Sequence, residues 1–201
     1  MSSYPSATLR PAVAELPDSG IVAIANYGRQ RPGLIPLWFG EGDLPTPEFI
    51  CEAAAQSLRA GETFYTYQRG LPELRQAIAD YHRRFGDGDL GAERIIVTSS
   101  GMQAIVNAVQ ATVGAGDEMA VVCPVWPNIL ATVALQQATP IPVLLDSTPD
   151  GWRLDLQRLL DACTPRPKAI VVKTPNTPTG WVMGEADWRA VFDFAGQRRL
   201  G

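Results

Sequence analysis

Histidine and cysteine are scarce in this chain of 201 residues, which contains one histidine and three cysteines. Cys51, Cys123 and Cys163 are odd in number and far apart, with no C-x-x-C pair. We therefore expect reduced, mostly buried thiols, and neither a disulfide framework nor a zinc site. His82 lies in a polar stretch, and we expect a solvated helical position there, because histidine-based sites need partners that this sequence does not supply.

Long apolar runs and blocks of one charge are also missing. No segment approaches the roughly 20 apolar residues of a membrane-spanning helix, and the N-terminus lacks the charged-then-apolar pattern of a signal peptide. We therefore expect a cytoplasmic protein with no membrane partner. The net charge of −4 comes from dispersed residues, so nothing indicates nucleic acid as a partner. The length and the 46% hydrophobic content fit about one globular domain.

From residue 37 onward, short apolar runs alternate with amphipathic segments. Such an alternation predicts an α/β fold of three layers, with a mostly parallel sheet covered by helices on both faces. In such sheets the chemistry gathers at the carboxyl ends of the strands. Pro142 predicts an irregular or edge strand, and Gly201 is the expected C-terminal glycine of the last helix. We expect an irregular arm at 1–36, strands at 37–39, 94–98, 118–122, 141–145 and 169–172, and helices at 47–60, 71–85, 102–113, 128–137, 154–163 and 186–199.

The loop at residues 98–103 leads from an expected strand into an expected helix. It contains Ser100, Gly101 and Met102, and the N–H groups and partial positive charge of a helix start favour a bound phosphate. Gly101 lets the backbone come close to such a ligand, and Ser100 offers a hydroxyl. Taken alone, the segment is more often a simple serine cap.

Two further loops follow expected strands. Residues 122–128 place Trp126 where an indole can stack on a flat heteroaromatic ring, although a tryptophan there more often fills space. Residues 173–180 contain two prolines and a glycine that hold amide and hydroxyl groups near a strand end, and alone they form only a tight turn. The order and spacing of the three loops favour a phosphorylated aromatic ligand more than any one of them does.

From residue 37 onward the chain resembles the class I and II aminotransferases, the fold-type I pyridoxal-phosphate enzymes. The resemblance covers roughly four-fifths of the chain, and this set of motifs in this order is highly specific. The matching segments are FGEGDLPTP at residues 39–47, YTYQRGLPELR at 65–75, SGMQA at 100–104, PVWPN at 124–128 and PNTPTG at 175–180.

The resemblance implies a role for each matching residue. The backbone of Gly40 would line the amino-acid pocket, and Tyr65 would reach the cofactor phosphate of the other subunit in a homodimer. The N–H groups of Gly101 and Met102, beside Ser100, would hold the phosphate of pyridoxal 5'-phosphate. Trp126 would stack on its pyridine ring.

The third loop departs from the family pattern. The family usually has an asparagine that hydrogen-bonds the pyridoxal hydroxyl oxygen, and this sequence has Thr177 in that column, with Asn176 one place earlier. Either residue is therefore a candidate for the contact, Thr177 through its hydroxyl or Asn176 if the loop shifts.

The cofactor-carrying lysine of the family has no counterpart here. Lys168 and Lys173 are the only lysines, and neither fits the family's lysine motif. We expect Lys173 to be solvated or ion-paired and not a surrogate. No catalytic residue and no metal ligand is therefore assigned, and we expect a chain that stops before the catalytic lysine and is inactive alone.

The resemblance implies two parts, an arm with the start of a small domain at residues 1–46 and a partial large cofactor-binding domain at residues 47–201. For the parent protein we expect transfer of an amino group between an amino acid and a 2-oxo acid. Two alternatives stay open, a lyase or synthase of the same fold and a non-catalytic remnant. A nucleotide-binding domain is disfavoured, because no glycine-rich phosphate motif is present.

Overall fold

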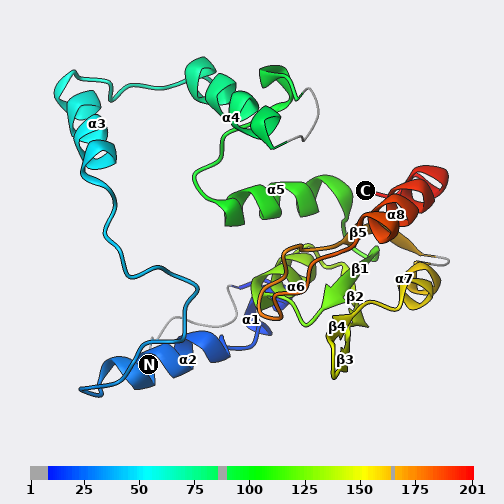
Figure 1. The fold of residues 1–201 in the computed structure, drawn as a ribbon. Coiled ribbons are helices and arrows are strands. Elements are labelled where there is room, and N and C mark those ends of the chain that lie inside the picture. Colours follow the sequence, from blue (N-terminus) through cyan, green and yellow to red (C-terminus); the bar gives the residue numbers. More distant parts are fainter. Residues whose placement is uncertain (1–8, 86–89, 164–165) are drawn as a thin grey trace. The chain divides into compact units, whose positions relative to one another are not determined.

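The computed structural model describes residues 9–85, 90–163 and 166–201, which divide into two compact units (Figure 1). The first unit joins the described residues up to Gly20 to Met102–Gly201, and the second unit is Ile21–Gly101. The break expected after residue 46 does not coincide with this division, and the assignment of a small and a large domain stays a prediction.

Three parallel strands form the sheet of the first unit, in the order β2–β1–β5. Strand β1 (Glu118–Cys123) lies between β2 (Thr139–Leu144) and β5 (Pro167–Val171), and all of its residues after the first are buried. A central strand covered on both faces is expected to be continuously apolar, as this one is. Strand β2 lies at the edge of this sheet and contains Pro142, so the edge strand predicted from that proline is confirmed. An edge strand tolerates proline because its outer side needs no N–H group for pairing.

Helices cover both faces of this sheet (Figure 1). Met119 and Val121 belong to a core shared with α5 and α6, whereas Ala120 and Val122 belong to a core shared with α7 and α8. The alternation arises because successive side chains of a strand point to opposite faces. The expected three-layer α/β architecture is therefore confirmed for this unit. The four helices are α5 (Gly101–Thr112), α6 (Pro127–Leu135), α7 (Leu156–Ala162) and α8 (Glu185–Arg198).

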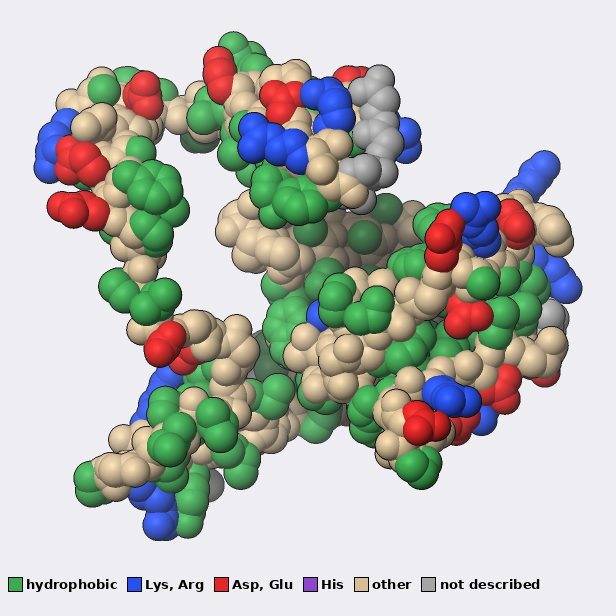
Figure 2. Space-filling view, in the orientation of Figure 1, with side chains coloured by type: hydrophobic (Ala, Val, Ile, Leu, Met, Phe, Trp, Pro, Cys, Tyr) green, Lys and Arg blue, Asp and Glu red, His purple; other side chains and the backbone are tan. Residues whose placement is uncertain are grey.

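The second unit consists of helices and irregular segments, and few of its described residues are buried. Arg75 of α4 holds the turn that follows this helix, because its guanidinium donates to the carbonyl oxygens of Ala92 and Ile95. No residue of α3 is buried, and Figure 2 shows green apolar side chains on the segments that carry α2 and α3. The elements are α2 (Gly20–Arg29), α3 (Glu48–Arg59), α4 (Pro72–Arg84) and the 3-10 turn η2 (Ala92–Arg94).

Two expected strands are absent from the described residues. Residues 37–39 are irregular, and Trp38 packs closely on Gly28 of α2 instead of lying in a strand pair. Residues 95–98 follow η2 without joining a sheet, and the N–H of Val97 donates to the carbonyl of Arg69 in a loop. An apolar run becomes a strand only when a neighbouring strand takes up its backbone hydrogen bonds.

Three further expectations are corrected. The N-terminal arm is not irregular throughout, because it contains α1 (Pro11–Ala14) and α2. A hairpin of β3 (Asp146–Thr148) and β4 (Gly151–Arg153) was not expected. Arg199, in the left-handed conformation, ends α8, whereas the backbone of Gly201 pairs with Lys168 and Ile170 beside β5. Gly201 is thus part of the sheet edge and not of the helix cap.

The cysteines behave largely as expected. All three cysteines are free, with Cys123 and Cys163 buried and Cys51 exposed. The described residues contain no cluster of three or more side chains suited to a metal ion. Within the same residues, no helix combines the length and the apolar character needed to cross a membrane.

The buried thiol of Cys163 makes stability depend on alkaline pH. Burial raises its pKa from 9.0 to about 11, so the folded state keeps a proton that the unfolded state releases first. We therefore expect the free energy of unfolding to fall between about pH 9 and about pH 11 by more than in Cys163→Ala. Denaturant titrations at about pH 8 and about pH 10.5 measure this, with Cys51→Ala as the exposed control. An equal loss in wild type and Cys163→Ala would contradict it.

Candidate functional site

Two of the three predicted loops meet at the carboxyl edge of the sheet. Strand β1 runs into the loop that carries Trp126 at the start of α6, and β5 runs into residues 172–180. Because β1 and β5 are parallel neighbours, their carboxyl ends lie at the same edge. Trp126 is half-buried and packs on the core below it, as does Val171 at the end of β5.

Asn176 ties these two loops together. Its amide nitrogen donates to the carbonyl oxygen of Pro124 at 2.7 Å and to the hydroxyl of Thr179 at 2.7 Å. Asn176 is only 5% exposed. Both amide hydrogens are therefore used inside the protein, and a further donation to a ligand would require breaking one of these bonds. The Oδ1 atom of the same amide is buried without a hydrogen-bond partner among the described residues.

Thr177 lies beside this tie and faces solvent. Its hydroxyl oxygen accepts a hydrogen bond from Nζ of Lys173 at 2.8 Å, and the same ammonium donates to the carbonyl oxygen of Pro175 at 2.9 Å. Thr177 is exposed, in contrast to its buried neighbour Asn176. Of the two residues considered for this position, Thr177 is the one with an accessible polar group.

The first predicted loop leads into α5. Helix α5 begins at Gly101, and Thr98 donates its hydroxyl hydrogen to the carbonyl oxygen of Ser100 at 2.8 Å. Gly101 and Ser100 are exposed, Met102 is half-buried, and a Cβ on Gly101 would meet nothing within 4 Å. The first turn of α5 contains no acidic residue, so no carboxylate opposes an anion there.

Helix α5 also packs on the core that supports Trp126. Ile105, one turn into the helix, lies against the same buried cluster as Trp126 and Val171. Elements from all three loop regions thus rest on one cluster of the first unit, with Val109 of α5 buried in it.

Tyr65 and Gly40 belong to the second unit. Tyr65 lies in the irregular segment between α3 and α4 and is fully exposed. Gly40 is exposed as well, and a Cβ at that position would meet nothing within 4 Å. Their expected contacts with the cofactor phosphate and the substrate stay predictions.

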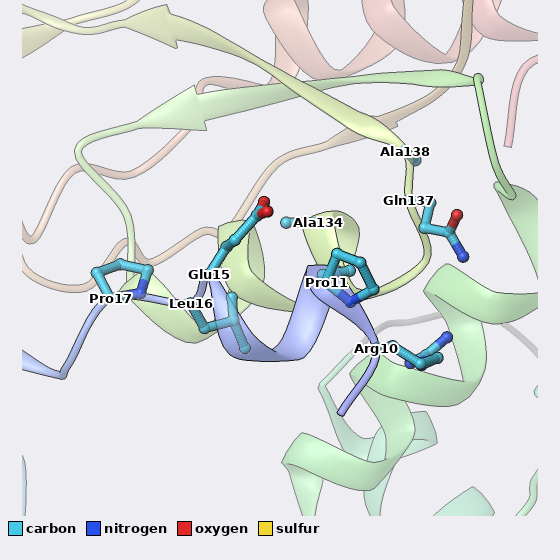
Figure 3. Close-up of a pocket in the computed structure, with 9 residues that line it drawn as sticks. Arg10, Pro11, Glu15, Leu16, Pro17, Ala134, Gln137 and Ala138 are labelled. Carbon is cyan, nitrogen blue, oxygen red and sulfur yellow. The ribbon is translucent and has the colours of Figure 1, made fainter. Parts of the chain in front are cut away.

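A separate cavity lies elsewhere in the first unit. It has a volume of about 560 Å³ and is lined by residues 10–17 and by the end of α6, including Arg10, Glu15 and Gln137 (Figure 3). Trp126 precedes the first turn of α6, whereas Gln137 follows its last turn. The cavity therefore lies at the opposite end of this helix from Trp126 and is not the site formed by the loops.

Two features of the loops were missed from the sequence. The bond from Asn176 to Pro124 joins residues 52 positions apart, and nothing local indicates it. The contact between Lys173 and Thr177 spans only four positions. Its signal in the sequence is a lysine directly after an apolar strand, a pattern that also fits a solvated or ion-paired side chain.

Comparisons with known proteins identify the family of this chain. Residues 34–200 match the family described as Aminotransferase class I and II. The chain is 41% identical over 155 residues to the aspartate/prephenate aminotransferase of Thermus thermophilus, covering 77% of this chain and 40% of that protein. It is 39% identical over 168 residues to a probable aspartate/prephenate aminotransferase of Thermus aquaticus, covering 83% of this chain and 43% of that protein.

A solved structure shows the same likeness in three dimensions. The aspartate aminotransferase from Thermus thermophilus with maleate superposes with a TM-score of 0.87 at 35% identity, covering 96% of this chain and 51% of that one. The chain thus spans less than half the length of these two curated relatives, at 43% and 40%. The family match nevertheless includes most of both units and all three loops. The chain belongs to the class I and II aminotransferases.

Proposed function

We propose that this chain is part of an enzyme that transfers an amino group between an amino acid and a 2-oxo acid with the help of pyridoxal 5'-phosphate. The observation that carries the proposal is the meeting of the Trp126 loop and the Thr177 loop at one sheet edge, tied by Asn176. Relatives named for aspartate and prephenate make aspartate the first amino donor to test. A cytoplasmic homodimer is part of the same proposal.

The residues present fit the three chemical parts of this cofactor. A phosphate suits the exposed start of α5, where Gly101 leaves open space and no acidic side chain opposes it. An aromatic ring suits the half-buried indole of Trp126, which the core holds from below. A ring oxygen suits the exposed hydroxyl of Thr177, and we favour Thr177 over Asn176 because the Asn176 amide hydrogens are already used.

Each of these residues has a defined task in the proposed mechanism. When bound, the cofactor stores the amino group and withdraws electrons from the α-carbon of the amino acid. The backbone N–H groups of Gly101 and Met102 would hold the anionic phosphate, and Trp126 would limit tilting of the ring. Thr177 would donate a hydrogen bond to the ring oxygen. Asn176 keeps the two loops at a constant separation, so these contacts are made without reorganisation.

Binding of pyridoxal phosphate tests this assignment. We expect Trp126→Phe to weaken binding by about three- to tenfold, because the smaller ring loses stacking area and the larger electron-rich surface of the indole. Quenching of tryptophan fluorescence and the absorbance of the bound cofactor both measure the dissociation constant. Trp152→Phe is the matched control, since Trp152 lies on the exposed hairpin strand β4, and it should leave binding unchanged.

Two results would count against the proposal. Failure of the wild-type chain to bind pyridoxal phosphate would remove the cofactor part, and equal effects of the two tryptophan changes would remove Trp126 from the site. Turnover is assayed on the whole enzyme of which this chain is part, with aspartate as donor and a 2-oxo acid as acceptor. Release of ammonia and a 2-oxo acid without any acceptor would identify a lyase instead of a transferase.

A further inference from the structure

Lys173 makes two hydrogen bonds to the loop that follows it. Its ammonium lies 2.8 Å from the hydroxyl oxygen of Thr177 and 2.9 Å from the carbonyl oxygen of Pro175. Of the two expected states of Lys173, solvated or ion-paired, the ion pair is not found among the described residues. The positive charge is held by loop oxygens beside Thr177, and no carboxylate of the described residues pairs with it.

The three threonines of this loop are used differently. The hydroxyl oxygens of Thr174 and Thr179 accept from the backbone N–H groups of Met183 and Trp181, at 2.9 Å and 3.2 Å, and both side chains are partly buried. Thr177 accepts from the ammonium of Lys173, and it is exposed. The first two hydroxyls therefore stabilise the loop, and the third is presented at its surface.

The bond from Lys173 also directs the hydroxyl proton of Thr177. A threonine hydroxyl has one hydrogen to donate, and an ammonium has no lone pair to accept it. With Lys173 donating to the oxygen, the hydrogen of Thr177 must point away from Lys173. The pair thus offers an oriented donor together with a positive charge, a combination suited to an oxygen atom that carries negative charge.

We propose that Lys173 is a positioning residue, which aims the Thr177 hydroxyl at the ring oxygen of bound pyridoxal phosphate and favours the ionised form of that oxygen by its charge. The inference rests on the proposed function, because it assumes that the cofactor ring lies beside Thr177. It assigns Lys173 a role without a covalent bond to the cofactor.

The chain contains a matched control for this residue. Lys168 lies at the other end of the same strand region, is exposed, and is the only other lysine. It precedes Lys173 by five positions, which corresponds to about 16 Å along an extended strand. Lys173→Met and Lys168→Met therefore remove the same charge and change the size of the side chain by the same amount. Only Lys173→Met also removes the contact with Thr177.

The test measures pyridoxal phosphate binding and the absorbance of the bound ring as a function of pH. For Lys173→Met we expect binding to be weakened about five- to tenfold. We also expect the pH at which the ring oxygen is half-protonated to rise by about one unit, because the positive charge that favours the ionised form is lost. Lys168→Met should leave both quantities unchanged, and Lys173→Arg, which keeps the positive charge, should titrate close to wild type. Thr177→Val should weaken binding, and adding it to Lys173→Met should cause little further loss.

The outcomes separate this inference from the proposed function. If wild type binds the cofactor and Trp126→Phe weakens binding, but Lys173→Met matches Lys168→Met, the inference is wrong and the proposed function stands. A lowered melting temperature of Lys173→Met with an unchanged pH profile would show a purely structural lysine and would also overturn it. So would a cofactor mass on the Lys173 peptide after borohydride reduction. Absence of wild-type binding would overturn both.

Discussion

Replacing Asn176 by aspartate is expected to destabilise the first unit by about 3–5 kcal/mol at pH 7. The two side chains have nearly the same shape, so packing is preserved and only the hydrogen-bonding groups change. A carboxylate in place of the amide nitrogen would be buried against two neutral oxygens, the carbonyl oxygen of Pro124 and the hydroxyl oxygen of Thr179, each now 2.7 Å from the amide nitrogen. Chemical denaturation monitored by circular dichroism measures the loss.

The pH dependence identifies the cause of this loss. Burial raises the pKa of the introduced carboxyl above its usual value of about 3.9, so the folded state favours the neutral acid, which can donate its proton to Pro124. The variant should therefore be closest to wild type at acid pH and lose stability as the pH rises through the folded pKa toward 7.

Asn128→Asp is the matched control for this experiment. Asn128 is exposed in the first turn of α6, where a negative charge is favourable to the helix. The same chemical change there should be neutral or slightly stabilising at pH 7. If Asn176→Asp behaved like Asn128→Asp, the buried tie between the two loops would be refuted.

Gly70→Ala is expected to cost about 2–5 kcal/mol of local stability in the second unit. Gly70 has a φ of +94°, and a Cβ built there would lie 2.5 Å from Cγ2 of Val97. The substitution therefore combines backbone strain with a steric overlap. The turn also contains two backbone bonds, from Gly70 to the carbonyl of Tyr67 and from Val97 to that of Arg69, which the strain would disturb.

Hydrogen exchange of the α4 amides, together with thermal melting, measures this change. Gly61→Ala separates the two causes, because Gly61 has a φ of +78° but open space where its Cβ would lie. It should show the backbone strain alone, about 1–2 kcal/mol. Adding Val97→Ala to Gly70→Ala should recover only a small part of the loss, because it removes the overlap with Cγ2 and leaves that with Cβ of residue 97 at 2.6 Å. Equal effects at Gly70 and Gly61 would show that the packing of Val97 is unimportant.

Much of the first unit was predictable because its signals are local. The apolar run of β1 and the helical periods around it indicated a buried parallel strand between covering helices, and the structure has both. The hairpin β3–β4 also has a local signal, the sequence Pro149-Asp150-Gly151 at its turn, which is typical of a tight turn between two strands.

The second unit shows where local signals are insufficient. Residues 95–98 have the β-branched and apolar composition of a strand, yet the N–H of Val97 goes to a loop carbonyl. Trp38 has a strand-like neighbourhood, yet it packs on Gly28. Strand formation depends on a partner strand, and composition does not specify whether one is near.

The residue types at the candidate site follow from the sequence, because a helix start, an aromatic side chain after a strand and a proline-rich loop are each encoded within a few positions. The arrangement of these residues in space does not follow from the sequence. Whether Asn176 or Thr177 offers a free donor depends on the parallel pairing of β1 with β5, which brings Pro124 to the Asn176 amide across 52 positions. Such a contact is set by the register of strands and the packing of whole layers, and these are properties of the folded chain that no short segment contains.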